Sequence, residues 1–349
     1  MAEQDFDVPL PPKQHYTVGI VYNLKGNTRG ATAAVDEEAE YDSIGTVEAI
    51  SSALERGGYR TVLLEAGRDL PDALAAGGID IAFNIAEGHG GRGREAQIPA
   101  ILNLYDVPFT GSDETTLCIA LDKALTKRLV SQEGVLCPAS AVIGGEDLSA
   151  AAGLRYPVIV KPNAEGSSKG ISEVSIVESP AELAELVQRN IALYRQNMLA
   201  EEYIEGREFT VGLLGNGRSL HVFPPMEILY KQPTQGAYHV YSYGVKQDYG
   251  RYVEYRCPPE LAPDQLARME SAARTVFEAL SCRDFARADF RMDRDGNIYF
   301  IEINPLPGLA PGYSDFPILA EFSGVGYDSL VQGVLEAALS RLGMEAQHA

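Results

Sequence analysis

Two carboxylates and an amide with the spacing of a metal site lie near the C-terminal end of the chain, as Asp289, Glu302 and Asn304. Between them, an Asp-Gly pair at 295–296 separates two runs rich in β-formers. This pattern is typical of a hairpin with a two-residue turn, which would place Asp289 directly opposite Glu302. Carboxylate and amide oxygens are ligands that Mg²⁺ prefers, together with phosphates and water.

The same register sets the surroundings of this candidate metal site. It places Arg287 opposite Asn304 on the polar face, because alternate residues of a strand share a face. The other face is then apolar and carries Ala288, Phe290, Ile301 and Ile303. A solvated hairpin face with cross-strand ion pairs is the alternative interpretation. The apolar back and the Asn-Pro step at 304–305 favour the metal site.

A second group of polar residues follows an apolar run that ends in Lys161, in the segment VKPNAEGSSKG at 160–170. Backbone N–H groups, the hydroxyls of Ser167 and Ser168 and two ammonium groups can surround phosphate oxygens. The spacing is not that of a Walker A loop, and a strand follows instead of a helix. A glycine- and serine-rich turn without a ligand is the alternative.

Acidic and basic residues in two further segments complete the candidate set. Glu201, Glu202, Glu205 and Glu208 end a strand-like run, where two of them could bind ribose hydroxyls and the backbone an adenine edge. The alternative is a solvated acidic loop. Lys123 and Lys127 have the i, i+4 spacing of a helix, which is typical of a solvated stripe.

The elements that must position these residues begin with an α/β segment. Apolar runs at 17–24, 61–66 and 79–87 predict buried strands, and 47–58 predicts an amphipathic helix. This alternation predicts a parallel sheet with right-handed crossovers. A glycine-rich loop with two arginines follows the third strand at 88–97, where open α/β sheets bind ligands, although a flexible connection is the alternative.

The rest of the chain predicts two more α/β lobes. One helix is expected over 116–134, strands at 156–162, 172–177 and 198–204, a helix over 263–280 and the hairpin at 286–304. We therefore expect three domains: an N-terminal domain over 1–115, a central domain over 116–207 and a C-terminal domain over 208–349.

Composition excludes several classes of function. The 349 residues include 29 Lys and Arg against 49 Asp and Glu, a net charge of −20, which is a poor footprint for nucleic acid or anionic membranes. The N-terminal stretch lacks the pattern of a signal peptide, and no apolar run is long enough to span a membrane. Four scattered cysteines are typical of reduced thiols, so we expect a cytoplasmic protein.

In their order along the chain, these motifs resemble the ATP-grasp fold, and specifically the D-alanine–D-alanine ligase family. The resemblance runs from TVGIVYNL to INPLPGL and includes PFTGSD (108–113), ALDKALTKRL, VKPNAEGSSKGIS, EGREFTV and the R-x-D…E-x-N hairpin. It implies a three-lobed α/β (α+β) ATP-grasp fold with an N-terminal parallel-sheet domain.

The resemblance also implies roles for individual residues. Those implied to bind ATP are Lys123, Lys161, Ser167, Ser168, Glu201, Ile204, Glu208 and Lys246. Asp289, Glu302 and Asn304 would bind two Mg²⁺ ions, with Mn²⁺ as an alternative. Arg287 and the backbone N–H of Gly308, with Ser167 in the closing loop, would act in catalysis.

Departures from the family pattern concern the amino-acid substrates. Arg94 stands in the altered glycine-rich turn, Gln247 replaces a tyrosine, and the serine expected to bind a carboxylate aligns near Tyr313, with Ser314 adjacent. The glutamate expected to meet the first amino group is Glu40, with Glu38 and Asp42 as alternatives. A tyrosine-dense segment between 230 and 255 could stack on a larger substrate or simply pack between strands.

The implied activity is an ATP-dependent, ADP-forming carboxylate–amine ligase that acts through an acyl phosphate. D-Alanine dimerisation and the joining of other amino acids or peptide-like acids are the alternatives for the substrates. An ATP-grasp kinase and a non-enzymatic nucleotide-binding module are weaker hypotheses. The expected partners are small molecules and a second copy of the chain in a homodimer, without nucleic acid or membrane.

Overall fold

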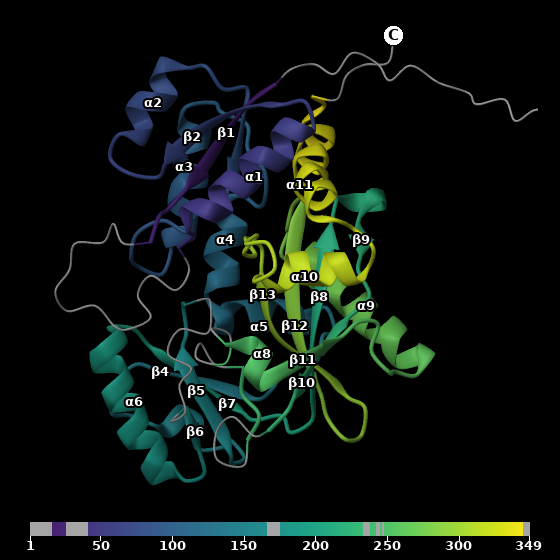
Figure 1. The fold of residues 1–349 in the computed structure, drawn as a ribbon. Coiled ribbons are helices and arrows are strands. Elements are labelled where there is room, and N and C mark those ends of the chain that lie inside the picture. Colours follow the sequence, from purple (N-terminus) through teal and green to yellow (C-terminus); the bar gives the residue numbers. More distant parts are fainter. Residues whose placement is uncertain are drawn as a thin grey trace, which may run out of the picture.

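A computed structural model describes residues 16–25, 41–165, 175–232, 238–241, 245 and 248–344. The described chain forms three sheets with helices around them (Figure 1). Among the described residues, no helix combines the length and apolar character needed to cross a membrane. The four cysteines are free thiols. Each sheet draws mainly on one of the three expected domains, whose boundaries stay a prediction.

The first sheet is parallel, with the strand order β2-β1-β3, as the strand–helix alternation predicts. Its elements are β1 (Thr17–Tyr22), α1 (Ile44–Arg56), β2 (Arg60–Glu65), α2 (Leu70–Ala76), β3 (Ile81–Asn84) and α3 (Gln97–Leu104). The expectation of three buried strands is wrong for β2, where Val62 and Leu63 are about two-fifths exposed. β2 and β3 are both outer strands of this sheet, but β3 also forms a bridge from Ala82 to Phe109 and is buried, whereas β2 has a neighbour on one side alone in the described chain.

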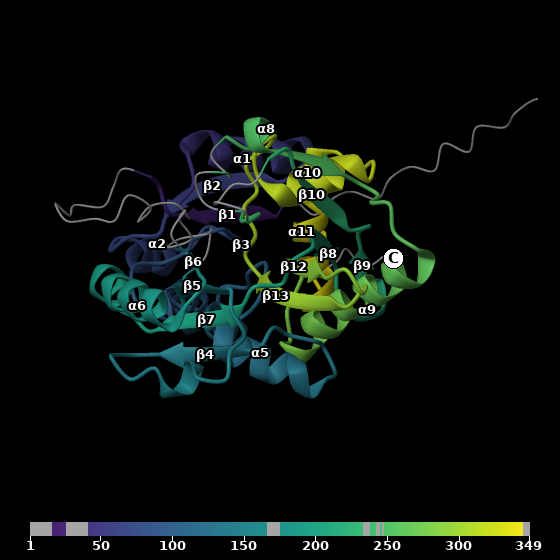
Figure 2. The same cartoon turned by 90° about the horizontal axis from the view of Figure 1, so that it is seen from below.

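The second sheet is antiparallel, with the order β4-β7-β5-β6, and α6 covers one of its faces (Figure 2). Its elements are β4 (Ser140–Ile143), β5 (Val158–Pro162), β6 (Ile176–Val177), α6 (Pro180–Tyr194) and β7 (Met198–Glu202). α6 begins with Ser179 as its N-cap and buries Leu183, Leu186 and Val187 against the strands. This packing fixes β5 and β7, which carry Lys161 and Glu201.

The third sheet has the order β11-β10-β8-β12-β13, with β9 paired to β8. Its strands are β8 (Arg207–Leu214), β9 (His221–Val222), β10 (Met226–Tyr230), β11 (Val253–Arg256), β12 (Phe285–Met292) and β13 (Ile298–Asn304). Its helices are α8 (Tyr249–Tyr252), α9 (Pro263–Ala279), α10 (Asp315–Phe322) and α11 (Tyr327–Leu342). α9 buries Met269, Ala273, Val276 and Phe277 in a core shared with β8, β12 and β13.

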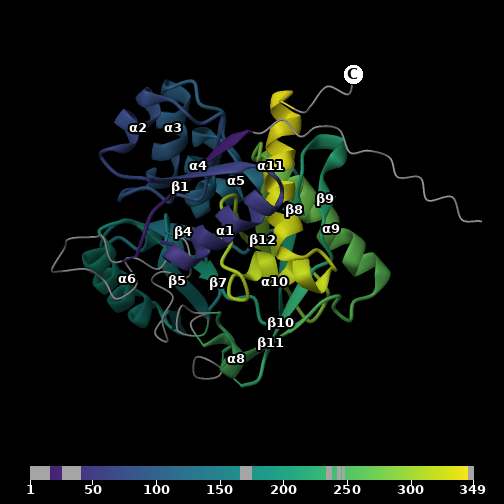
Figure 3. The ribbon, with the colours of Figure 1, turned by 45° about the horizontal axis from the view of Figure 1, so that its top comes forward.

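The C-terminal helix α11 joins the first and third sheets. It packs beside α1 (Figure 3), where Gln332 Nε2 donates to the carbonyl of Ala53 at 2.8 Å. An exposed ion pair between Arg56 and Asp328 adds a second link. Buried residues of both helices belong to one apolar core. The lobes of the N- and C-terminal segments are therefore packed together.

The single helix expected over 116–134 is instead two helices, α4 (Glu114–Leu121) and α5 (Lys123–Gln132). Asp122 ends the first and caps the second, with ψ 94° and a side chain that accepts from Leu125 N. Asn163 holds this break, because its Nδ2 donates to Asp122 Oδ1 at 2.8 Å and its carbonyl accepts from Lys123 N at 3.0 Å. The break places Lys123 at the first turn of α5.

The hairpin β12–β13 has the predicted register at the candidate metal site, with Asp289 opposite Glu302 and Arg287 opposite Asn304. The predicted two-residue turn is wrong. The loop spans 293–297, and Met292 pairs with Ile298, one residue away from the predicted register. A β-bulge beyond Asp289 leaves Ile301 without a strand partner and restores the register at the site.

The bulge also changes which residue enters the core. Ala288, Phe290 and Ile303 are buried on the apolar face as predicted, but Phe300 takes the place expected for Ile301. Ile301 lines a cavity on the opposite side. The carbonyls of Phe300 and Ile301 accept hydrogen bonds from a helix packed against them, as described below.

Candidate functional site

A cavity of about 600 Å³ lies where residues of all three lobes meet. It is lined by every predicted site residue that the structure describes, except Arg94. These lining residues are Lys123, Lys161, Glu201, Ile204, Glu208, Arg287, Asp289, Glu302, Asn304, Gly308, Tyr313 and Ser314. The predicted residues Glu40, Ser167, Ser168, Lys246 and Gln247 lie outside the described residues.

Two groups of side chains form the cavity wall and the layer directly behind it, to which Lys127 and Tyr255 belong. We call the first the lysine cluster: Lys123, Lys127, Lys161, Glu201 and Glu208. We call the second the tyrosine cluster: Tyr241, Tyr255, Tyr313, Ser314 and Asp315. The hairpin residues Arg287, Asp289 and Glu302 link the two clusters by direct contacts.

Lys123 projects from the first turn of α5 into the lysine cluster. Its Nζ lies 3.3 Å from Glu302 Oε2 and donates to the carbonyl of Glu165. Glu165 directly precedes the glycine- and serine-rich loop singled out in the sequence. The ammonium group therefore stands between the candidate metal ligands and the start of that loop, where it can neutralise phosphate charge.

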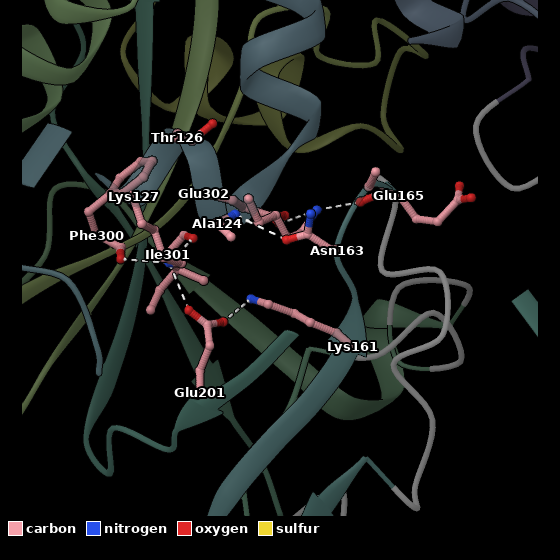
Figure 4. Close-up of polar contacts among 12 residues, drawn as sticks. Ala124, Thr126, Lys127, Lys161, Asn163, Glu165, Glu201, Phe300, Ile301 and Glu302 are labelled. Atoms are coloured by element: carbon pink, nitrogen blue, oxygen red, sulfur yellow. Dashed lines mark hydrogen bonds and ion pairs between the residues drawn. The ribbon is translucent and has the colours of Figure 1, made fainter. Parts of the chain in front are cut away.

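Glu201 lies between two lysine ammonium groups in the buried part of the cluster. Lys161 Nζ is 2.6 Å from Glu201 Oε2, and Lys127 Nζ is 2.9 Å from Glu201 Oε1 (Figure 4). Lys127 also donates to the carbonyls of Phe300 and Ile301, at 3.2 and 2.5 Å. All three charged side chains are at most 3% exposed, so each charge depends on these partners.

The neighbouring charges in and beside this cluster shift one another's pKa values. Burial opposes ionisation of Glu201, but Lys127 and Lys161 outweigh it and lower the pKa of that carboxyl. Burial also lowers the pKa of Lys127, while Glu201 opposes the shift. For Glu302, burial is outweighed by Lys123, Lys161 and Arg287, which lower its pKa to about 2. Glu201 and Glu302 are therefore ionised at neutral pH.

Glu208, the predicted ribose ligand, lies on β8 beside a residue that was not predicted. Its Oε2 accepts from Arg291 Nη1 at 3.0 Å and from the Tyr230 hydroxyl at 2.8 Å. Arg291 also lies over the Tyr203 ring, 4.7 Å from its centre. These contacts hold the Glu208 carboxylate at the cavity wall and leave further lone pairs to accept hydroxyl donors.

The chemistry of the hairpin face fits a divalent metal ion. Burial raises the pKa of Asp289 to about 7; Arg287 opposes this shift and the charge of Glu302 adds to it. A cation bound between two neighbouring carboxylates would reduce the repulsion between their negative charges. Asn304 Nδ2 is buried with no hydrogen-bond partner among the described residues, so the structure shows no hydrogen bond that would hold this amide group away from a metal.

The protein donors number two carboxylates and one amide. No group of three His, Cys, Asp or Glu side chains with metal-binding spacing occurs in the described part of the chain. Such a partial set is characteristic of Mg²⁺ sites, which complete their coordination with phosphate oxygens and water.

Arg287 stands between the candidate metal ligands and the tyrosine cluster. Its Nη1 lies 2.8 Å from Asp289 Oδ1 and 3.4 Å from Asp315 Oδ2. Thr210 on β8 supports the same carboxylate, because its hydroxyl donates to Asp289 Oδ1 at 2.6 Å. The guanidinium is thus held in the cavity as a fixed positive charge and can stabilise a developing oxyanion.

Asp315, which was not predicted, is the buried carboxylate of the tyrosine cluster. It is 3% exposed and begins α10, directly after Ser314. Its Oδ1 accepts from the Tyr255 hydroxyl at 2.9 Å and from the Tyr241 hydroxyl at 3.2 Å. The two hydroxyls are 2.6 Å apart. Two hydroxyl donors and a guanidinium therefore surround this carboxylate.

Ser314 and Gly308 lie close together beside Asp315. Ser314 Oγ accepts from Ala310 N at 3.2 Å. A Cβ atom at position 308 would be 2.8 Å from Ser314 Oγ, so this close approach requires glycine. Of the two residues predicted near the carboxylate-binding serine, Ser314 is the buried one and Tyr313 is partly buried.

The first lobe contributes acidic residues to the cavity. Asp42, an alternative to Glu40 in the sequence, lines the cavity near Lys25, and burial raises its pKa to about 7 against the charge of Lys25. Arg94 does not itself line the cavity: its Nη1 donates to the carbonyl of Ala164 at 3.1 Å, and its guanidinium contacts two lining carboxylates, Glu95 at 3.6 Å and Glu165 at 3.5 Å. A 3₁₀ turn over Arg94–Ala96 instead brings Glu95 to the cavity.

Sequence reasoning missed Lys127, Arg291 and Asp315, for different reasons. Lys127 was interpreted as part of a solvated stripe, which is wrong because α5 packs against β13 on that side. Arg291 follows Arg287 and Asp289 in the alternation of β12, so the same pattern could have identified it. For Asp315 the sequence offers no signal, because its partners are distant in the chain.

Comparison with known proteins gives a consistent family assignment. The family model described as "D-ala D-ala ligase C-terminus" matches residues 146–336. A D-alanine–D-alanine ligase of Geobacter sulfurreducens is 33% identical over 301 residues, covering 85% of this chain and 89% of that protein. The uncharacterized protein y4sG of Sinorhizobium fredii is 32% identical over 305 residues, covering 84% and 87%.

Solved structures share the fold at lower sequence identity. A D-alanine–D-alanine ligase from Bacillus anthracis, complexed with ATP, matches with a TM-score of 0.73 at 22% identity. The match covers 95% of this chain and 99% of that chain. VanG, a D-Ala:D-Ser ligase from Enterococcus faecalis, matches with a TM-score of 0.73 at 20% identity, covering 93% of this chain and all of VanG. These likenesses establish the fold.

Proposed function

The chain belongs to the D-alanine–D-alanine ligase family of ATP-dependent, ADP-forming ligases, and we propose that its cavity joins the carboxylate of one amino acid to the amine of a second substrate. The lysine cluster takes ATP. Lys123 and Lys161 hold the phosphates, Glu201 and the backbone at Ile204 hold adenine, and Glu208 holds the ribose.

Asp289, Glu302 and Asn304 are the residues that would hold Mg²⁺. The metal would neutralise phosphate charge and orient the phosphates of ATP. Lys123 lies 3.3 Å from Glu302 and so adds its positive charge beside the same oxygens. Water and ATP supply the remaining ligands.

The reaction then proceeds in two steps, phosphoryl transfer and amide formation. An oxygen of the first substrate's carboxylate attacks the γ-phosphorus, the bond to the β-phosphate oxygen breaks, and ADP and an acyl phosphate form. The amine of the second substrate attacks the acyl carbon and loses a proton, and phosphate leaves as the amide bond forms. Arg287 and the N–H of Gly308 stabilise the tetrahedral oxyanion between these events.

The observation that carries this proposal is the convergence of the two lysines, the paired carboxylates and Arg287 on one cavity. These residues come from α5, β5, β12 and β13, and they meet only in the folded chain. A phosphoryl acceptor bound beside Arg287 lies next to a fixed positive charge suited to an acyl intermediate, which favours a ligase over a kinase.

The test is an assay of ADP release with single and paired amino acids, each as the D and the L enantiomer, with mass spectrometry of the products. We expect ADP and a dipeptide to appear in equal amounts for at least one pair. ADP without any amide product would support the kinase instead. Release of neither ADP nor product across the panel would contradict the ligase.

A substrate pair other than two D-alanines is the second candidate, and Asp315 favours it. This carboxylate stands beside Ser314, which we propose to bind the second substrate. A fixed negative charge there disfavours a small zwitterion and favours an acceptor that donates hydrogen bonds or carries positive charge. The amino-acid panel therefore needs basic residues and amino-acid amides.

Two further predictions accompany this function. The homodimer implied by the family resemblance is tested by light scattering of the purified chain, which should give twice the mass of one chain. A cytoplasmic location is the second prediction, and fractionation of cells that express the chain tests it.

A further inference from the structure

Lys127 is a buried charge with an unusual set of partners. Its ammonium group contacts Glu201 of β7 and the carbonyls of Phe300 and Ile301 in β13 (Figure 4). α5 therefore joins the second and third sheets through one side chain that is 3% exposed. Removing a partner from a buried charge is costly, so these contacts hold one another in place.

The contact with Glu201 leaves that carboxylate available to a ligand. Lys127 Nζ is 2.9 Å from Glu201 Oε1, and a carboxylate oxygen has more than one lone pair, so Oε1 can accept a further donor beside this ion pair. Glu201 is 2% exposed and lines the cavity. The amino group of adenine is a suitable donor for an oxygen in this position.

Lys161 cannot serve as the permanent partner of Glu201. It contacts Oε2 at 2.6 Å, but as a proposed phosphate ligand it must also face the nucleotide. The other contacts of Lys127 are main-chain carbonyls of the bulge in β13, which are not among the proposed phosphate ligands. Lys127 is thus the lysine whose hold on Glu201 does not depend on the phosphates.

We propose that Lys127 is a positioning residue for base recognition: it holds the Glu201 carboxylate in place and aimed at the base, and so makes the site selective for adenine over a base with a carbonyl at the same position. The helix spacing explains its place, because Lys123 and Lys127 lie one turn apart on α5. One reaches the candidate metal site and the other reaches Glu201. This inference rests on the proposed ATP site.

The test compares the affinities of ATP and ITP by calorimetry, since inosine carries a carbonyl in place of the adenine amino group. Binding is measured instead of turnover, so a chain that binds nucleotide without ligating amino acids still tests Lys127. The ratio of the two affinities within one variant does not depend on the fraction of folded protein. Lys127→Met should reduce the preference for ATP about tenfold or more.

Matched variants separate positioning from general damage. Arg128→Met removes one positive charge from an exposed position on the same helix and should leave the ratio unchanged. Lys127→Gln keeps N–H donors for the two carbonyls, removes the charge, and should reduce the ratio as Lys127→Met does. If Lys127→Met does not fold, Lys127→Gln provides the same test.

The proposal is overturned if both Lys127 variants weaken ATP and ITP equally, because a purely structural lysine would act in that way. It is also overturned if the wild-type chain binds the two nucleotides equally well. Adenine preference that is unchanged in Glu201→Gln would assign base recognition to another residue. Failure of ligation with selective ATP binding would contradict the proposed function and leave this inference intact.

Discussion

The two clusters that share the cavity treat charge differently. In the lysine cluster, each buried charge meets an opposite charge at close range, as in the 2.6 Å contact of Lys161 with Glu201. In the tyrosine cluster, Asp315 is held by two phenol hydroxyls, and its cation, Arg287, is 3.4 Å away and also contacts Asp289. Charges of the first cluster have close partners of opposite sign, two of which, Glu302 and Arg291, lie just outside it, whereas the second cluster depends on a shared guanidinium.

This difference separates a site suited to a nucleotide from a pocket suited to selecting an acceptor. A nucleotide brings several negative charges, so preformed lysines with fixed partners suit it. An acceptor pocket selects its ligand by charge and shape, and a carboxylate held mainly by neutral donors leaves a negative field there. The comparison predicts large effects on turnover from the lysine cluster and effects on selectivity from the tyrosine cluster.

The largest effect is expected for Glu302→Gln. The change removes a candidate metal ligand and the partner of Lys123, and a lost metal contact is worth several kcal/mol, or ~10³-fold in kcat/KM. Steady-state ADP release measures it. Glu278→Gln on the exposed side of α9 is the control and should match the wild type. Activity within threefold of wild type for Glu302→Gln would remove the metal assignment.

Arg287→Gln, at the junction of the clusters, should cost about 10²-fold in amide formation. Phosphoryl transfer should be affected less, so the acyl phosphate would hydrolyse before the amine attacks it. We expect the ratio of dipeptide to ADP to fall well below one, measured by mass spectrometry and coupled ADP detection. A variant that slows both steps equally would show that Arg287 does not act in the second step.

Asp315→Asn should change selectivity more than rate. Its charge repels an acceptor's carboxylate, so the wild-type chain should prefer an amino-acid amide over the free amino acid by kcat/KM. The variant should lose about tenfold of that preference, because one charge interaction at short range is worth roughly 1–4 kcal/mol. Tyr255→Phe removes one donor to Asp315 but keeps its charge, so it should retain the preference.

The smallest effect is expected for Arg155→Ala. Arg155 contacts Glu202, which is next to Glu201 in the chain, with a 2.6 Å ion pair. The Arg155 side chain is 84% exposed, and exposed pairs contribute little to stability. The KM for ATP should stay within about twofold of wild type. A larger change in the KM for ATP would mean that this exposed ion pair matters for nucleotide binding as the buried pairs of the lysine cluster do.

Much of the site could be predicted because its residues follow local patterns. The alternation in β12 and β13 placed Asp289, Glu302 and Asn304 on one face, and the observed register agrees at these positions. The prediction succeeded there although the turn is longer than expected, since the bulge at Ile301 compensates for the difference. No pattern in the two strands indicates that bulge.

The fold was predictable at the level of element types, and less so for burial and breaks. Strand–helix alternation identified the parallel sheet, but β2 is partly exposed because, unlike the other outer strand β3, it has no further segment bridged to its free side among the described residues. The helix pattern over 116–134 is continuous, yet it breaks at Asp122, which Asn163 holds from a distant segment. Periodicity reports which residues share a face and carries no information about contacts with distant segments.

The sequence by itself determined which side chains carry the chemistry: the lysines, the strand-end acids and the hairpin ligands, whose spacing within one element follows from backbone geometry. The tertiary structure alone decided how these groups pair. Lys127 turned from an expected surface residue into a buried partner of Glu201, and Asp315 came to lie beside Arg287. The physical reason is that the energy of a buried charge depends on groups contributed by other elements, which only packing brings within contact distance.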